Sequence, residues 1–136
     1  MIRAYQSGDA HKVLVQKAQI QESIYADNFE NIYAYTLCDD TAVYAVFGWR
    51  MAAPYSAECF ALIGQNCRTK LLELVRFLIR EIPIIMRQCY ICRVTFTVKK
   101  NFLAGERLAK LLGFSFVALL PRFFLNDDYQ LFERIL

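Results

Sequence analysis

The sequence predicts a mixed α/β fold formed by a single domain over residues 1–136, and three observations predict it. Hydrophobic residues make up 57% of the chain and charged residues 21%, so there is ample apolar material for one core. Segments typical of strands are interspersed with segments of helical spacing. Near the centre, an apolar run passes through a short turn into a long apolar stripe, which predicts a β–α–β unit with parallel strands.

The predicted elements follow one another along the whole chain. They are a strand at 2–5, a helix at 10–24, a short helix at 25–31, strands at 32–37, 41–49 and 57–63, a helix at 67–82, a strand at 90–98, a helix at 102–112, and strands at 114–119, 123–125 and 129–135. The hairpins on either side of the central unit are expected to be antiparallel, because short turns connect their strands.

Turn and cap residues delimit the elements of the N-terminal half. Asp9 is a good N-cap for the first helix, whose apolar residues recur with helical spacing. The pair Asp39-Asp40 lies between two segments of strand-forming residues, which predicts a β-hairpin. Pro54 separates this hairpin from the next strand.

The central helix and the later elements have equally local signals. Asn66 or Thr69 is expected to cap the central helix, and Pro83 is expected to end or kink it. Residues 90–98 are β-branched and aromatic, so they predict a strand, and Gly113 is expected to end the late helix. Near the C-terminus, Pro121-Arg122 is expected to interrupt a strand, and Asn126-Asp127-Asp128 predicts a hairpin turn.

Composition and charge exclude several classes of protein. The net charge of +3, from 16 basic and 13 acidic residues, is too small to argue for nucleic-acid binding by itself, and a nucleic-acid binder is a third hypothesis with only this charge behind it. No apolar run approaches the roughly 18 residues that a membrane span needs. The polar start and the five cysteines, an odd number, predict a reduced, cytoplasmic protein. The high apolar share also predicts an exposed apolar face and a homodimer.

The sequence predicts no metal site and no cysteine nucleophile. His11 is the only histidine and is expected to lie on the surface. Cys89 and Cys92 have zinc-knuckle spacing, but there is one such pair, and in a strand the two side chains would point to opposite faces. Cys59 and Cys67 have no histidine nearby in the sequence, so we expect buried, unreactive thiols.

The order of elements and several local sequences resemble the GCN5-related N-acetyltransferase (GNAT) superfamily along essentially the whole chain. The start IRAYQSGDAHKV looks like the family's first strand and capped helix, and KLLGF at Lys110–Phe114 looks like the end of its late helix. The size and the tail FFLNDDYQLFERIL further resemble small proteins of this fold from T7-like phages and prophages. The resemblance implies a mostly antiparallel sheet with a central parallel unit and helices on both faces.

The resemblance also implies an acetyl-CoA-dependent N-acyltransferase, with a CoA thioester and an amine acceptor as substrates. The family binds the pyrophosphate of acetyl-CoA where the fourth strand turns into the long helix. The residues implied to bind the cofactor are Leu62, Ile63, Gly64, Gln65, Asn66, Cys67, Arg68, Thr69, Lys70 and, after the next strand, Asn101. Glu58 is the candidate catalytic base, although an ordinary strand-end carboxylate is the alternative interpretation.

Departures from the family's pattern keep a second hypothesis open. Asn66 and Arg68 stand where the family's loop has glycines, so Arg68 and Lys70 are either phosphate ligands or solvated charges. Ala109 replaces a frequent tyrosine acid, and Asn101 is one residue out of register, which favours a helix-capping role for it. The alternative is a catalytically silent GNAT-fold binding or structural accessory protein of phage or prophage origin, in which the C-terminal aromatic residues serve packing rather than acceptor binding.

Overall fold

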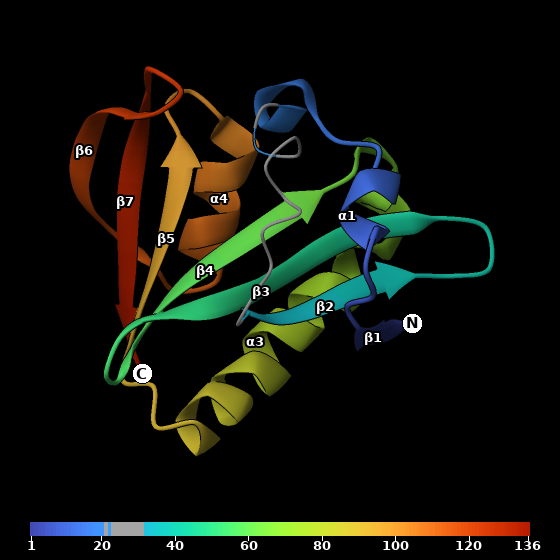
Figure 1. Cartoon of the computed structure of the whole chain (residues 1–136), viewed down its shortest axis with the longest axis horizontal. Coiled ribbons are helices and arrows are strands. Elements are labelled where there is room, and N and C mark those ends of the chain that lie inside the picture. Colours follow the sequence, from blue (N-terminus) through green and yellow to red (C-terminus); the bar gives the residue numbers. More distant parts are fainter. Residues whose placement is uncertain (21, 23–31) are drawn as a thin grey trace. The chain divides into compact units, whose positions relative to one another are not determined.

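The computed structural model describes residues 1–20, 22 and 32–136 (Figure 1). The elements are β1 (Ile2–Ala4), α1 (Asp9–Lys12), η1 (Lys17–Gln19, a 3₁₀ helix), β2 (Ile32–Cys38), β3 (Val43–Ala53), β4 (Ser56–Ile63), η2 (Gln65–Lys70, a 3₁₀ helix), α3 (Leu71–Gln88), β5 (Arg93–Lys99), α4 (Leu103–Leu111), β6 (Ser115–Phe124) and β7 (Asp127–Ile135). The short helix predicted at 25–31 lies outside the described residues.

The strands form one seven-stranded sheet in the order β1-β2-β3-β4-β5-β7-β6. Antiparallel ladders join β1 to β2, β2 to β3, β5 to β7 and β6 to β7. Strands β4 and β5 pair in parallel, and α3 lies between them in the sequence. The predicted mixed α/β fold with a mostly antiparallel sheet and a central parallel unit is confirmed. None of the described helices is long and apolar enough to cross a membrane.

The chain divides into two compact units. The N-terminal unit comprises residues 1–50 and 60–76, and the C-terminal unit comprises residues 51–59 and 77–136. In the N-terminal unit, the buried residues of β2 and β3 supply most of the core, including Leu37, Val46, Phe47 and Trp49. In the C-terminal unit, Figure 1 shows α4 beside β5, and Gly105 of α4 approaches so closely that a Cβ there would lie 2.7 Å from Val98 Cγ1.

The first helix is much shorter than predicted. It ends at Lys12, and Val13 already has an extended backbone. The side chain of Val13 is buried against β2 and β3, and Val15 forms an antiparallel bridge with Gly64. Pairing with the end of β4 therefore outweighs the helical periodicity that the local sequence carries, as tertiary contacts commonly do.

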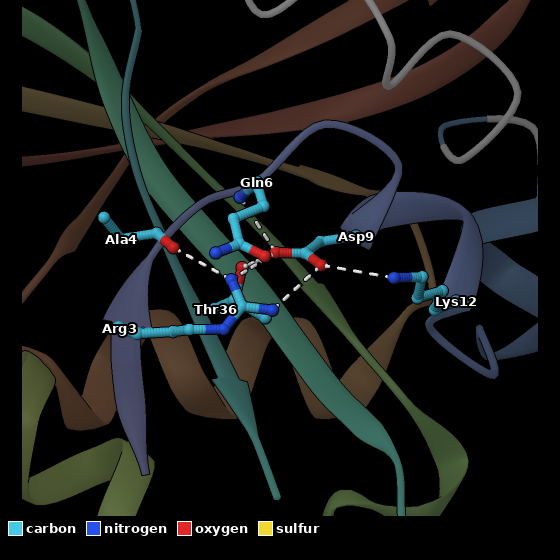
Figure 2. A network of polar contacts seen from close by, with 6 residues as sticks. All are labelled: Arg3, Ala4, Gln6, Asp9, Lys12 and Thr36. Carbon is cyan, nitrogen blue, oxygen red and sulfur yellow. Dashed lines mark hydrogen bonds and ion pairs between the residues drawn. The ribbon is translucent and has the colours of Figure 1, made fainter. Parts of the chain in front are cut away.

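The predicted capping role of Asp9 is also wrong, because Gly8 is the N-cap and Asp9 is the first helical residue. Figure 2 shows its fully buried carboxylate at the centre of a polar network. It accepts hydrogen bonds from Arg3 Nη1 (2.7 Å), Thr36 Oγ1 (2.7 Å) and the Gln6 N–H (2.9 Å). Burial alone would raise the pKa of Asp9, but these donors outweigh it and lower the pKa to about 2. The carboxylate thus ties β1, α1 and β2 together.

The central helix begins and ends differently from the prediction. It opens as the 3₁₀ helix η2, whose N-cap is Gly64 without a side-chain hydrogen bond, so neither Asn66 nor Thr69 caps it. It then continues through Pro83 to Gln88. The proline removes one backbone donor, but Ile82 and Met86 on either side of it are buried, and this apolar burial favours continuing the helix.

Residues in the left-handed conformation end α3 and α4, and the first of them sets where β5 begins. After α3, Tyr90 adopts a left-handed conformation (φ 60°), and the Ile91 N–H bonds to the Met86 carbonyl, so β5 begins at Arg93 rather than at residue 90. After α4, Gly113 (φ 84°) has the same role, as predicted.

Strand β6 also differs from its prediction. It runs through Pro121-Arg122 as one strand with a shift of register, rather than as two separate segments. Its turn to β7 centres on Leu125 and Asn126, both with positive φ, so this hairpin turn lies slightly earlier than predicted.

Candidate functional site

The candidate site is the turn from β4 into η2 and α3, within the N-terminal unit. Gly64 lies at this turn, and its N–H donates to the Tyr44 carbonyl of β3 at 2.8 Å. A Cβ at this position would lie 2.9 Å from that carbonyl oxygen and 2.6 Å from Asn66 Oδ1. The glycine is therefore required by close approach of the chain to β3 and to its own loop.

The chain itself satisfies several backbone groups at this turn. The Gln65 N–H donates to the Leu14 carbonyl at 2.7 Å, and the Cys67 N–H donates to the Gly64 carbonyl at 3.1 Å. Gln65 Nε2 reaches the Val15 carbonyl at 3.0 Å. The segment that follows α1 thus packs directly on the loop that was predicted to hold a pyrophosphate, and the Gly64 and Gln65 amides already have partners.

The same segment also reaches the edge of β4. Because the Gly64 N–H faces β3 and strand residues alternate, Ala61 and Ile63 present their backbone groups at the opposite edge. There Gln19 Nε2 donates to the Ala61 carbonyl at 2.7 Å, and Gln19 Oε1 accepts from the Ile63 N–H at 3.2 Å. Gln16 Nε2 donates to the Ile63 carbonyl at 3.1 Å. Sequence reasoning missed both glutamines.

Two cations lie just beyond the turn. Arg68 is exposed, and Lys70 Nζ lies 5.9 Å from the centre of the Tyr44 ring. Among the described residues neither side chain forms an ion pair. Their positive charges are thus not neutralised by a neighbouring carboxylate, which leaves them able to bind an anion.

Asn66 is the one member of the loop with an unsatisfied buried atom. Its Oδ1 is buried and has no hydrogen-bond partner within the described part of the chain. A buried acceptor without a donor costs about 1–3 kcal/mol, which marks the position as one where a ligand donor would be stabilising.

Glu58 lies on the part of β4 that belongs to the C-terminal unit. It is half-buried and opposite Thr95 in the parallel ladder with β5. Asn101 follows β5 in the same unit, is exposed and has φ 69°. Phe102, not Asn101, is the N-cap of α4, without a side-chain hydrogen bond, so the predicted capping role of Asn101 is wrong. The structure brings together Leu62 to Lys70, whereas Glu58 and Asn101 belong to the other unit.

Cys59 and Cys67 have raised pKa values, whereas Cys89 and Cys92 lie on the surface. Burial and the nearby charge of Glu58 raise the pKa of Cys59 to about 12, and burial raises the pKa of Cys67. Neither thiol ionises readily, which is unfavourable for a nucleophile. Cys89 and Cys92 are exposed in the α3–β5 connection rather than within a strand. The described residues contain no cluster of three or more potential metal ligands.

Comparison with solved structures decides the fold class. No protein-family model matches the sequence, and the curated proteins contain no match. An acetyltransferase from Bacillus subtilis in complex with CoA matches with TM-score 0.75 and 14% identity, over 99% of this chain and 97% of that one. The IAA acetyltransferase from Bacillus cereus matches with TM-score 0.74 and 12% identity, over 100% and 99%. A "probable acetyltransferase (GNAT family)" from Chromobacterium violaceum matches with TM-score 0.74 and 13% identity, over 98% and 86%.

The chain has the GNAT fold. At these identities the match concerns the backbone arrangement, so activity has to be argued from the residues of the chain itself. The sequence contains no signal that Gln16 and Gln19 bind the edge of β4. Each glutamine lies more than 40 residues from its partner in the strand, and both lie within a segment of helical spacing.

Proposed function

We propose that this protein is an acetyl-CoA-dependent N-acyltransferase that transfers an acetyl group from CoA to an amine. The observation that carries the proposal is the edge of β4, where an amide group is seated between the Ala61 carbonyl and the Ile63 N–H. The pantetheine arm of CoA contains two amides on an extended chain, so it can make the same pair of hydrogen bonds. The GNAT fold and the neighbour crystallised with CoA support this assignment.

The proposed cofactor site extends from this edge into the turn. Leu62 and Ile63 contribute the strand, Gly64 to Cys67 form the turn, and Arg68, Thr69 and Lys70 form the first turn of the helix. Arg68 and Lys70 replace, through side-chain charge, the glycine amides that a backbone cradle would use. Asn101, which follows β5, is a further proposed cofactor ligand by resemblance to the family.

In the proposed reaction, the amine nitrogen attacks the thioester carbonyl, the C–S bond breaks, and CoA leaves as the thiolate, which takes up a proton from water. Glu58 is the proposed base that removes the amine proton. Replacing it in Glu58→Gln should lower kcat by about 100-fold or more while leaving the Kd for acetyl-CoA unchanged.

Calorimetry with CoA and acetyl-CoA tests the cofactor assignment. We expect Arg68→Ala and Lys70→Ala each to weaken binding by about tenfold, because each removes a charge-assisted contact to phosphate. Arg87→Ala is the matched control, since Arg87 is exposed near the far end of α3. Turnover is then followed as CoA released from acetyl-CoA in the presence of mixed primary amines. Absence of any binding at millimolar CoA would contradict the proposal.

The second candidate is a catalytically silent GNAT-fold accessory protein of phage or prophage type. The internal partners of the Gly64 and Gln65 amides and the alanine at position 109 favour it. It predicts no turnover, so CoA binding together with release of CoA from acetyl-CoA in the presence of amines would count against it.

A homodimer also remains a prediction, and the edge strand β6 supports it. Its exposed apolar side chains are those of Phe116, Val117, Leu119 and Phe123. An apolar edge strand is a natural site of strand pairing between copies. Light scattering over a range of protein concentrations tests this, and Phe116→Lys should shift the distribution toward monomer.

A further inference from the structure

The side-chain amide of Gln19 reproduces the bonding of a neighbouring strand. A residue of a parallel strand donates its N–H to the carbonyl of one residue and accepts from the N–H two residues further on. Gln19 does the same with Ala61 and Ile63, at 2.7 and 3.2 Å. Gln16 completes the edge by donating to the Ile63 carbonyl at 3.1 Å. We call these three hydrogen bonds the Gln16–Gln19 clasp.

The clasp is built into the fold rather than being a chance surface contact. The side chain of Gln19 is only 6% exposed, and its Nε2 also lies 3.3 Å from Glu22 Oε2. The preceding residues are held to the same loop by the Val15–Gly64 bridge and by the bond from the Gln65 N–H to the Leu14 carbonyl. The glutamine amides are therefore held against β4 by the fold around them.

The clasp occupies the backbone groups that the proposed cofactor would use. The Ile63 N–H has a single proton to donate and already donates it to Gln19 Oε1, so Gln19 and a ligand cannot both accept from it. Gln19 Nε2 also lies 2.7 Å from the Ala61 carbonyl, where the amide of a ligand in the same pose would lie. The side chain of Gln19 and the pantetheine arm both bind through amide groups. They therefore compete for the same carbonyl and N–H of β4. Nothing covalent changes when one replaces the other.

We infer that the Gln16–Gln19 clasp is an autoinhibitory contact that closes the β4 edge of the cofactor site and must open before CoA binds. The inference rests on the proposed function. It makes the apparent affinity for CoA the intrinsic affinity reduced by the fraction of molecules with an open clasp. Any partner or condition that draws the segment of residues 13–19 away from β4 would activate the protein.

Calorimetry with CoA on four forms of the full chain tests the clasp. We expect Gln19→Ala to bind CoA about tenfold more tightly than the wild type, and Gln16→Ala/Gln19→Ala more tightly still. Gln88→Ala is the matched control, because Gln88 is exposed at the end of α3, and its Kd should equal that of the wild type. If an alanine variant does not fold, Gln19→Glu keeps the volume and replaces the donor to Ala61 with a carboxylate oxygen.

Amide hydrogen exchange followed by NMR provides a readout that a merely structural role would not move. In the wild type, CoA should release the Gln19 side-chain amide into fast exchange while the Ile63 N–H stays protected, since pantetheine takes over as its acceptor. Equal CoA affinity in all forms, or a Gln19 amide that stays protected when CoA is bound, overturns the clasp and leaves the proposed function standing. Absence of CoA binding in every form overturns the proposed function and the autoinhibitory role together.

Discussion

The backbone groups along one edge of β4 have different hydrogen-bond partners in the two halves of the strand. Residues 56–59 pair with the backbone of β5 in a parallel ladder, from Ser56 opposite Arg93 to Cys59 opposite Phe96. Ala61 and Ile63, further along the same edge, pair with the side chains of Gln16 and Gln19. One half is therefore bonded to a strand of the sheet, and the other half to side chains that can be displaced.

The two halves of β4 differ in which part of the protein must move before their backbone groups can bind another molecule. Opening the ladder requires a whole strand to leave, whereas opening the clasp breaks three side-chain hydrogen bonds. Each side-chain hydrogen bond contributes only about 0.5–1.5 kcal/mol net, so a ligand of ordinary affinity can displace all three. If CoA binds as proposed, the clasp protects the edge from strand pairing and from solvent without closing it permanently.

The largest expected effect comes from breaking the ladder half. Ala57→Pro removes a backbone donor in the middle of a central strand, which should cost about 3 kcal/mol or more. Ala57 is fully buried, so the ring also has no free space around it. Urea unfolding followed by circular dichroism measures the loss. Ala57→Gly is the control and should cost only about 1 kcal/mol, and a similar loss in both variants would show that pairing with β5 is not what stabilises this half.

The next effect concerns the carboxylate upstream of the clasp segment. The pKa of Asp9 is lowered from 3.8 to about 2, so its contribution to stability is present above about pH 4 and is lost as the pH falls toward 2. Asp9→Asn should therefore cost about 1–2 kcal/mol at neutral pH, allowing for solvent screening of Arg3. The wild type and the variant should converge in stability near pH 2. A constant difference across this range would contradict the assignment.

Removing the clasp should have a smaller effect on stability than either change. Gln19→Ala leaves the Ala61 carbonyl and the Ile63 N–H without their partners, but water can reach an edge once the side chain has gone. We expect a loss of about 1 kcal/mol in urea unfolding, together with faster hydrogen exchange at Ile63. A loss as large as that of Ala57→Pro would mean that the clasp stabilises the fold as strongly as the ladder with β5 does, which would contradict a displaceable clasp.

The smallest expected effect lies in the connection that leads into β5. Tyr90 is 76% exposed and has φ 60°, a conformation that suits glycine better than a residue with a Cβ. Tyr90→Gly should therefore stabilise the protein by up to about 1 kcal/mol. Gly113→Ala, at the equivalent position after α4 (φ 84°), should destabilise it by a similar amount. Thermal unfolding of the two variants should shift in opposite directions.

Prediction from the sequence succeeded where the signal is local. The late helix and its glycine end, the β2–β3 hairpin and the parallel unit around α3 were all visible from spacing and turn residues. It failed for the helix expected at 10–24, for a helix end at Pro83, the first of the two alternatives there, and for the capping roles of Asp9, Asn66 and Thr69. A contact with a distant segment outweighed the local preference at residues 13–15 and at Asp9, and apolar burial did so around Pro83.

The sequence by itself determined the fold class, because hydrophobic periodicity and turn chemistry act over a few residues and are written in the chain. It also placed the positive charges of Arg68 and Lys70 at the start of the central helix. Only the tertiary structure decided what faces the edge of β4. Gln16 and Ile63 are 47 positions apart, and Gln19 and Ala61 are 42 apart. Pairing over such a separation depends on how the folded chain brings its segments together, which no local pattern encodes.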